Sequence, residues 1–238
     1  MDGSIRAVVR FAGVLGIAAA FTLATGCDGK VIHLGDGRAD GGPSCAHAQV
    51  SANEVVWIGD SWILVTGTQH TRVRDLARAA GAIGPSDDYV IAAVAASTMS
   101  AIAGQYDAQE AGATKVKVVI MDGGTWDTIQ GMGSSTSVSD AAGAFMQFLA
   151  QVAADGTVEH VVYFLPPALM SIPGVDALRP LVQQACAQST VPCHFLDLQQ
   201  PPFGGHSEYT AGFLPSEAGS MVLGDAIWSV MQQSCIAQ

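Results

Sequence analysis

The sequence predicts a single α/β domain in which a parallel β-sheet lies between two layers of helices. Five short apolar runs alternate along the chain with longer stretches that have the spacing of amphipathic helices. Strands that alternate with helices in this way pair in parallel and are covered on both faces. Hydrophobic residues make up 49% of the 238 residues and charged residues 13%, which suits one large buried core. We therefore expect a three-layer α/β/α fold with a five-stranded sheet.

Each element follows from a local pattern. The strands are expected at residues 55–58, 89–92, 115–121, 161–165 and 194–198. The helices are expected from the end of the first strand to near Gly81, and then over residues 100–110, 139–154, 176–188 and 216–232. Gly112 suits a left-handed cap after the second helix, and Ser139 suits the start of the third. The carboxyl ends of the strands are where a site is expected in such a fold.

Residues 1–26 have the pattern of an export signal. Arg6 and Arg10 give a basic start, residues 11–23 form an apolar run, and small residues precede Cys27. The run is too short to span a bilayer as a stable helix. The ending at residues 23–27 resembles a bacterial lipoprotein signal, which would make Cys27 the lipidated first residue of the mature chain. Ordinary cleavage, releasing a secreted or periplasmic protein, is the alternative, and either outcome places the protein outside the cytoplasm.

The mature chain is predicted to begin with a tether over residues 27–48, followed by one domain over residues 49–238. The tether is rich in glycine and aspartate and lacks apolar periodicity. Asp36 and Asp40 do not have the spacing of a calcium loop, so we predict no metal site and no cofactor. The formal net charge of −11 argues against nucleic-acid binding and against anionic membrane surfaces. A lipid anchor would be the membrane contact, and the oligomeric state stays open.

The five cysteines fit an exported protein. With Cys27 lipidated, four remain that an oxidising compartment would allow to pair, and three connectivities are open. We favour Cys186 with Cys193, because a helix end and the next strand start lie close together. We favour Cys45 with Cys235, because the termini of a domain are often neighbours. Four reduced, buried cysteines are the alternative.

Ser61 lies on a sharp turn between the first strand and the first helix. A serine at such a turn exposes its hydroxyl and places its own N–H at a helix N-terminus, which suits a nucleophile and an oxyanion donor. Helix capping by Asp60 or Ser61 would explain the same residues.

Three blocks together resemble the SGNH (GDSL) hydrolase family. They are IGDS at residues 58–61, VVIMDGG at 118–124 and GFLPSEAG at 212–219. The resemblance covers about residues 54–233 and implies a flavodoxin-like sheet that carries hydrolysis of acyl, acetyl or lipid esters. It implies Ser61 as the nucleophile, and the N–H groups of Ser61 and Ala96 as oxyanion donors, with Ala96 where the family has glycine.

Three further family positions, in two blocks, differ in this chain. The third block holds Trp126 in place of the oxyanion asparagine, between Gly124 and Asp127. The last block holds Ala211 and Leu214 in place of the catalytic aspartate and histidine. Because a serine at its ordinary pKa needs a base, losing that histidine typically costs on the order of 10⁶ in turnover.

His206 is the candidate substitute base. It lies eight residues before Leu214, next to two glycines, and Glu208 or Asp127 could orient it. A plain surface histidine is the alternative.

The residues expected around the cleft are Asp60, Trp62, Gly124, Trp126, Asp127 and Leu214. Of these, Trp62 and Trp126 are the best candidates to hold an apolar or sugar-like ligand, although packing would explain them equally. Two functions follow. One is an exported serine ester hydrolase acting on an acyl, acetyl or lipid ester, with a small-molecule ester or a glycan as its ligand. The other is an inactive binding lipoprotein in which Trp126 and Leu214 fill the former catalytic space.

Overall fold

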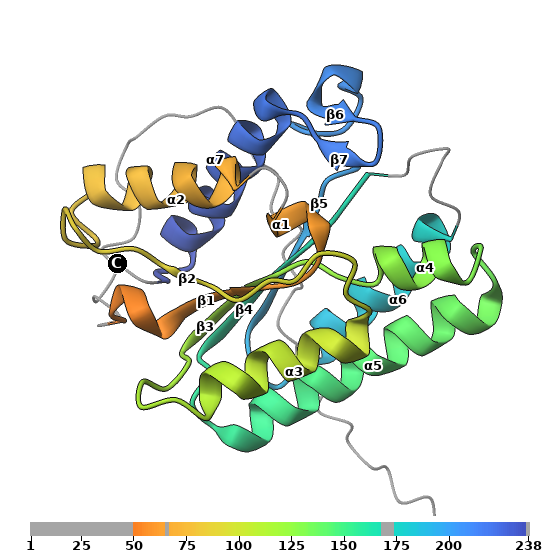
Figure 1. Ribbon diagram of the computed structural model, residues 1–238, viewed down its shortest axis with the longest axis horizontal. Coiled ribbons are helices and arrows are strands. Elements are labelled where there is room, and N and C mark those ends of the chain that lie inside the picture. Colours follow the sequence, from red (N-terminus) through yellow and green to blue (C-terminus); the bar gives the residue numbers. More distant parts are fainter. Residues whose placement is uncertain (1–49, 65–66, 168–173, 237–238) are drawn as a thin grey trace, which may run out of the picture. The chain divides into compact units, whose positions relative to one another are not determined.

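The computed structural model describes residues 50–64, 67–167 and 174–236. Its five main strands form one parallel sheet in the order β2-β1-β3-β4-β5 (Figure 1). They are β1 Val55–Ile58, β2 Val90–Ile91, β3 Val118–Met121, β4 His160–Leu165 and β5 Cys193–Asp197. The predicted α/β class and the five-stranded parallel sheet are confirmed.

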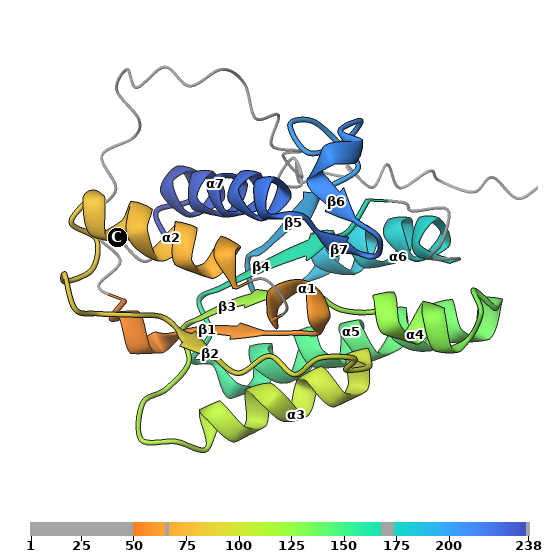
Figure 2. The same ribbon diagram turned by 45° about the horizontal axis from the view of Figure 1, so that its top comes forward.

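Helices cover both faces of this sheet (Figure 2). They are α1 Ser61–Leu64, α2 Thr68–Ala79, α3 Met99–Glu110, α4 Thr125–Gln130, α5 Ser135–Asp155, α6 Val175–Gln188 and α7 Glu217–Gln233. Helices α3, α5 and α6 lie on one face, and α2 and α7 pack together on the other. Two short 3₁₀ helices, η1 Ala52–Glu54 and η2 Ser207–Tyr209, and a hairpin of β6 Thr210–Ala211 and β7 Leu214–Pro215 complete the fold.

The sheet separates two hydrophobic clusters because neighbouring residues of a strand point to opposite faces. In β1, Val56 and Ile58 pack with α3, α5 and α6, whereas Val55 and Trp57 pack with α2 and α7. All four side chains are buried. This explains why the strand reads as a continuous apolar run instead of an alternating one.

The helix boundaries differ from the sequence prediction at three places. The first predicted helix is split into α1 and α2. The predicted start at Ser139 is wrong, because α5 begins earlier, where Ser134 Oγ accepts a hydrogen bond from the Ser137 N–H at 3.2 Å. Helix α4 was not predicted, because its six residues are too few to show a helical period.

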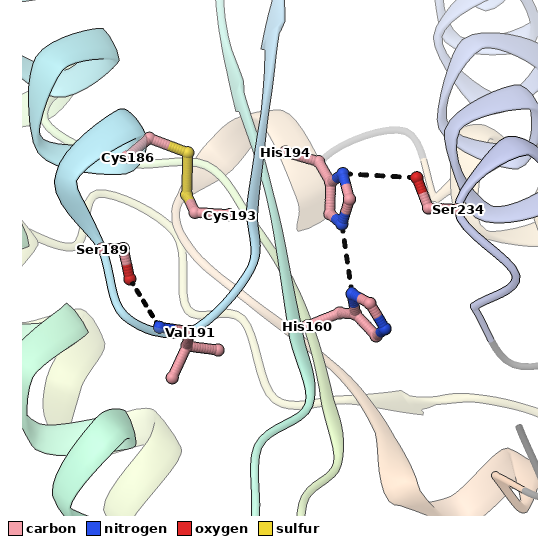
Figure 3. Close-up of a disulfide and its surroundings, with 7 residues drawn as sticks. All are labelled: His160, Cys186, Ser189, Val191, Cys193, His194 and Ser234. Carbon is pink, nitrogen blue, oxygen red and sulfur yellow. Dashed lines mark hydrogen bonds between the residues drawn. A yellow bond between two sulfur atoms is a disulfide. The ribbon is translucent and has the colours of Figure 1, made fainter. Parts of the chain in front are cut away.

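The predicted Cys186–Cys193 disulfide is present and joins the end of α6 to the start of β5 (Figure 3). Cys45 lies outside the described residues, so its pairing with Cys235 stays a prediction. The predicted signal, the lipidation site at Cys27 and the tether also lie outside them. Within the described part of the chain, no helix is both long enough and apolar enough to cross a membrane.

Candidate functional site

The turn that carries Ser61 is fixed by a glycine. β1 ends at Ile58, Gly59 and Asp60 form the turn, and Ser61 is the first residue of α1. Gly59 has a φ of +148°, and a Cβ placed on it would come within 1.8 Å of Asp122 Oδ1. A side chain at position 59 is therefore excluded, so the chain can pass close to β3 only with glycine there.

Gln105 on α3 forms hydrogen bonds with both backbone groups of Gly59 in this turn. Its Oε1 accepts from the Gly59 N–H at 2.7 Å, and its Nε2 donates to the Gly59 carbonyl at 2.9 Å. The Nε2 group also donates to Ser97 Oγ at 3.0 Å, which ties the turn to the loop after β2. Sequence reasoning missed this residue. The available signal was a polar residue three positions after the buried Ile102, on the inward face of the helix.

Two buried carboxyl groups, those of Asp60 and Asp122, meet at this turn. Asp60 is 3% exposed, its Oδ1 accepts from the Trp62 N–H at 3.1 Å, and its own N–H donates to Asp122 Oδ1 at 2.8 Å. Burial, and then the neighbouring Asp60 charge, raises the pKa of the Asp122 carboxyl well above its ordinary value. Asp60 was expected to line the ligand cleft; in the structure its carboxylate is buried and caps α1.

The structure brings Ser61 and Ala96 together. The Ala96 N–H donates to Ser61 Oγ at 3.1 Å. Ala96 adopts a φ of +57°, in the left-handed region that favours the glycine of the family pattern. Ser61 is half-buried and Ala96 is exposed, so this donor and hydroxyl lie at the edge of the domain.

Asp127 serves the start of α3. Its Oδ2 accepts from the N–H of Met99, the first residue of that helix, at 2.8 Å, and burial raises its pKa. Gly124 is buried, and a Cβ on it would come within 2.6 Å of Leu178 on α6. Gly124 was expected to line the cleft; in the structure it packs closely against α6. Trp126 is partly exposed and stays a candidate ligand contact.

Trp62 belongs to the core. Its side chain is 1% exposed, packs near Phe203 with ring centroids 6.1 Å apart, and donates from Nε1 to the Phe213 carbonyl at 2.8 Å. This indole ties α1 to the turn of the β6–β7 hairpin, which favours packing over a ligand contact for Trp62. Leu214 is partly buried against the same cluster and pairs with Ala211 across the hairpin.

His206 is oriented by Glu208, as the sequence suggested. Their Nδ1 and Oε1 atoms lie 2.8 Å apart, and the imidazole stacks on Tyr209. Within the described ranges, however, no hydrogen bond joins His206 to Ser61. In both views β7 is the strand of the hairpin nearer to α1, and the chain that precedes β6 lies farther from α1 (Figures 1 and 2). In the structure, the hydrogen-bond partner of His206 is Glu208 and that of Ser61 Oγ is the Ala96 N–H.

Comparison with known proteins places the fold. No family model matches the chain, and no curated protein matches it. Solved structures, in contrast, do match the chain. A protein described as a putative lipolytic protein of the G-D-S-L family, from Desulfitobacterium hafniense, is 15% identical, with a TM-score of 0.58 over 74% of this chain and 98% of that one. The chain has the fold of the SGNH/GDSL esterases.

Two further structures extend this likeness. The esterase EstA from Pseudoalteromonas, inhibited by monoethylphosphonate, is 11% identical, with a TM-score of 0.58 over 76% of this chain and 98% of that one. A family two carbohydrate esterase from Clostridium thermocellum, in complex with cellohexaose, is 16% identical, with a TM-score of 0.54 over 77% of this chain and 65% of that one. At these identities the likeness concerns the fold.

Proposed function

We propose that this protein binds an ester or carbohydrate ligand at Ser61 and Ala96 without measurable hydrolysis of esters. One observation carries the proposal. Position 214, where the SGNH hydrolases that this chain resembles have their histidine base, holds a leucine packed against the core. A serine hydroxyl without a base in hydrogen-bond reach is a weak nucleophile. The Ser61 hydroxyl and the Ala96 N–H can still donate hydrogen bonds to a ligand oxygen. An esterase site uses such donors to bind the oxygen of its substrate.

We infer the ligand class from a structurally similar protein and from the chemistry of the site. Both donors are uncharged and lie at the surface, so they suit a carbonyl or hydroxyl oxygen better than a strongly charged group. The structurally similar carbohydrate esterase was solved with cellohexaose. Trp126 is partly exposed and follows β3, where an aromatic face could stack on a sugar.

A serine ester hydrolase is the second candidate. The observation in its favour is the His206–Glu208 pair, which has the hydrogen bond that orients a catalytic imidazole. For this function, the segment before β6 would have to bring His206 to Ser61 when substrate binds.

Rebuilding the missing pair tests the proposal. Ala211 and Leu214 are cross-strand partners, so the double variant Ala211→Asp/Leu214→His places a carboxylate beside an imidazole. We expect the natural protein to show no turnover of short-chain aryl esters and no fluorophosphonate labelling. The double variant should gain both, and adding Ser61→Ala should remove them.

The opposite results are equally clear. Turnover and labelling by the natural protein that disappear in both Ser61→Ala and His206→Ala would overturn the binding proposal in favour of the hydrolase. A double variant that folds, as judged by circular dichroism, and still has no Ser61-dependent activity would show that position 214 is not what limits catalysis.

We also propose that the chain is exported and, through Cys27, anchored as a lipoprotein. The Cys186–Cys193 disulfide supports an oxidising compartment. Mass spectrometry of the protein from its native membrane should find a mature chain that begins at a lipid-modified Cys27. A cleaved chain with an unmodified Cys27 would indicate a secreted or periplasmic protein, and an uncleaved chain in the cytoplasm would overturn export.

A further inference from the structure

Two histidines lie together at the starts of β4 and β5 (Figure 3). Val162 on β4 is the partner of His194 on β5, and His160 lies two residues before Val162. Residues two apart in a strand share a face, so the two imidazoles project from the same side of the sheet. Their facing nitrogens, His160 Nδ1 and His194 Nε2, are 3.1 Å apart.

This separation matches what one metal ion requires. Two nitrogens that are each about 2.0 Å from a metal, with an angle of about 90–110° between them, lie about 2.8–3.3 Å apart. The observed 3.1 Å falls within that range. A metal could therefore replace the hydrogen bond between the imidazoles once each ring, now facing the other with centroids 5.3 Å apart, turns its nitrogen toward the ion.

The surroundings prepare both rings as neutral ligands. Burial lowers the pKa of His160, and burial together with His160 lowers the pKa of His194 to about 4. His194 Nδ1 lies 3.4 Å from Ser234 Oγ at the end of α7. A partner on the far nitrogen fixes the tautomer of a metal-bound histidine and leaves the other nitrogen free to coordinate.

The charges near His160 and His194 do not repel a cation. Glu159 adds a favourable negative charge next to His160. Lys117 is already paired with Glu54 at 3.5 Å and with Glu159 at 3.9 Å. Both histidines are half-buried, so solvent reaches this edge of the domain.

The support for His194 is rigid. The disulfide of Cys193 holds the start of β5 to the end of α6 through the opposite face of the strand. A ligand on a strand fixed in this way keeps its orientation before the metal arrives, which lowers the cost of binding.

We propose that His160 Nδ1 and His194 Nε2 form a site for a late first-row divalent cation, with Cu²⁺ bound most tightly. Imidazole nitrogens suit Cu²⁺, Ni²⁺ and Zn²⁺, and the general order of affinity places Cu²⁺ first. On binding, the proton on His160 Nδ1 moves to its Nε2, so the neutral rings need lose no net proton. No group of three or more metal-ligating side chains occurs among the residues that the structure describes, so solvent completes the coordination.

The site is separate from the one built around Ser61. Ser61 follows the carboxyl end of β1, whereas His160 and His194 begin β4 and β5 at the opposite edge of the parallel sheet. The metal proposal therefore stands or fails independently of any esterase or binding function.

Calorimetric titration of the tag-free, full-length mature protein with Cu²⁺ tests the proposal. We expect one equivalent to bind at the pair. Loss of outer-shell partners alone typically costs 10–100-fold in metal affinity, so His160→Gln or His194→Gln should raise the Kd about 100-fold or more. His206→Gln is the matched control for an exposed histidine, and His33→Gln/His47→Gln controls for the tail; both should bind as the natural protein does.

A Zn²⁺ titration followed by long-range ¹H–¹⁵N spectra gives a second readout that does not depend on variants folding. The His160 Nδ1 and His194 Nε2 resonances should shift together and saturate at one equivalent. Unchanged resonances at saturating Zn²⁺, or Cu²⁺ affinity that survives both substitutions, would overturn the site. Affinity that disappears only in the tail or His206 controls would overturn it too.

Discussion

The N–H of Ala96 donates a hydrogen bond to Ser61 Oγ across 3.1 Å. The two residues are 35 positions apart in sequence, and the end of β1 and the loop after β2 bring them together. The Ala96 N–H, which under the proposed function would donate to a ligand oxygen, donates here to the serine hydroxyl. An incoming carbonyl therefore has to displace this hydroxyl or share the N–H with it.

Replacing Ala96 with glycine should keep this contact and relieve backbone strain. A left-handed conformation costs an ordinary residue about 1–2 kcal/mol, and part of that gain is offset by the greater freedom of glycine in the unfolded chain. We expect Ala96→Gly to stabilise the protein by up to about 1 kcal/mol in urea unfolding. Ala96→Val should destabilise it, because a β-branched residue fits poorly at a φ of +57°. Equal stability of the two variants would contradict the strain.

Replacing Asp122 with asparagine should change how stability depends on pH. Because the pKa of Asp122 is raised, the folded protein keeps this proton above about pH 4, where the unfolded chain releases it. The group therefore makes stability fall as pH rises from about 4 toward its folded pKa, by about 1.4 kcal/mol per pH unit. Asp122→Asn lacks this loss, so its stability relative to the natural protein should increase between pH 4 and pH 7.

Urea unfolding at several pH values measures this difference. Asp75→Asn is a suitable control, because Asp75 is an exposed carboxylate on α2. If the difference between Asp122→Asn and the natural protein stays constant from pH 4 to pH 7, Asp122 is ionised in the folded state.

Trp62 should contribute more to stability than Trp126. Trp62→Phe removes the Nε1 donor to the Phe213 carbonyl and part of a buried ring, and we expect a loss of about 1–3 kcal/mol. Trp126 is partly exposed, so Trp126→Phe should cost less than about 1 kcal/mol. Urea unfolding followed by far-ultraviolet circular dichroism measures both. A larger loss for Trp126→Phe would mean that the hairpin is not anchored through Trp62.

Removing the Cys186–Cys193 disulfide should lower stability moderately. The bond closes a short loop with a sequence separation of seven, for which the loss of chain entropy in the unfolded state amounts to about 2–3 kcal/mol. We expect Cys186→Ala/Cys193→Ala to lower the Tm by roughly 4–12 °C, as measured by calorimetry. A reductant should lower the Tm of the natural protein by at least this amount, and any shift that it causes in the double variant would come from the predicted Cys45–Cys235 bond.

Long apolar runs allowed most of the fold to be predicted from sequence. β3 and β4 were evident because every residue of β3 is buried and Pro166 follows the end of β4. β2 was predicted over four residues and has two, because the chain around Ile91 lies at the sheet edge and pairs only with β1. At an edge, burial constrains the sequence less, so its boundaries are harder to locate.

The site was less predictable because its geometry depends on contacts between distant residues. The junction at Ser61 and the approach of Ala96 follow from parallel topology, which the sequence shows. The direction in which Trp62 and Asp60 point does not follow, because one turn of helix decides whether a side chain enters the core or the cleft. Gln105 was missed for a similar reason: its partners are backbone groups 46 residues away.

Ala211 and Leu214 pair across the turn of a surface hairpin, outside the five-stranded sheet. The two positions on which the proposed function turns therefore lie outside the sheet, although Leu214 still packs against the core. A lineage could exchange catalysis for recognition, or reverse the exchange, through a pair of substitutions that change one hairpin and its contact with the core. The five-stranded sheet and the turn at Ser61 would stay as they are.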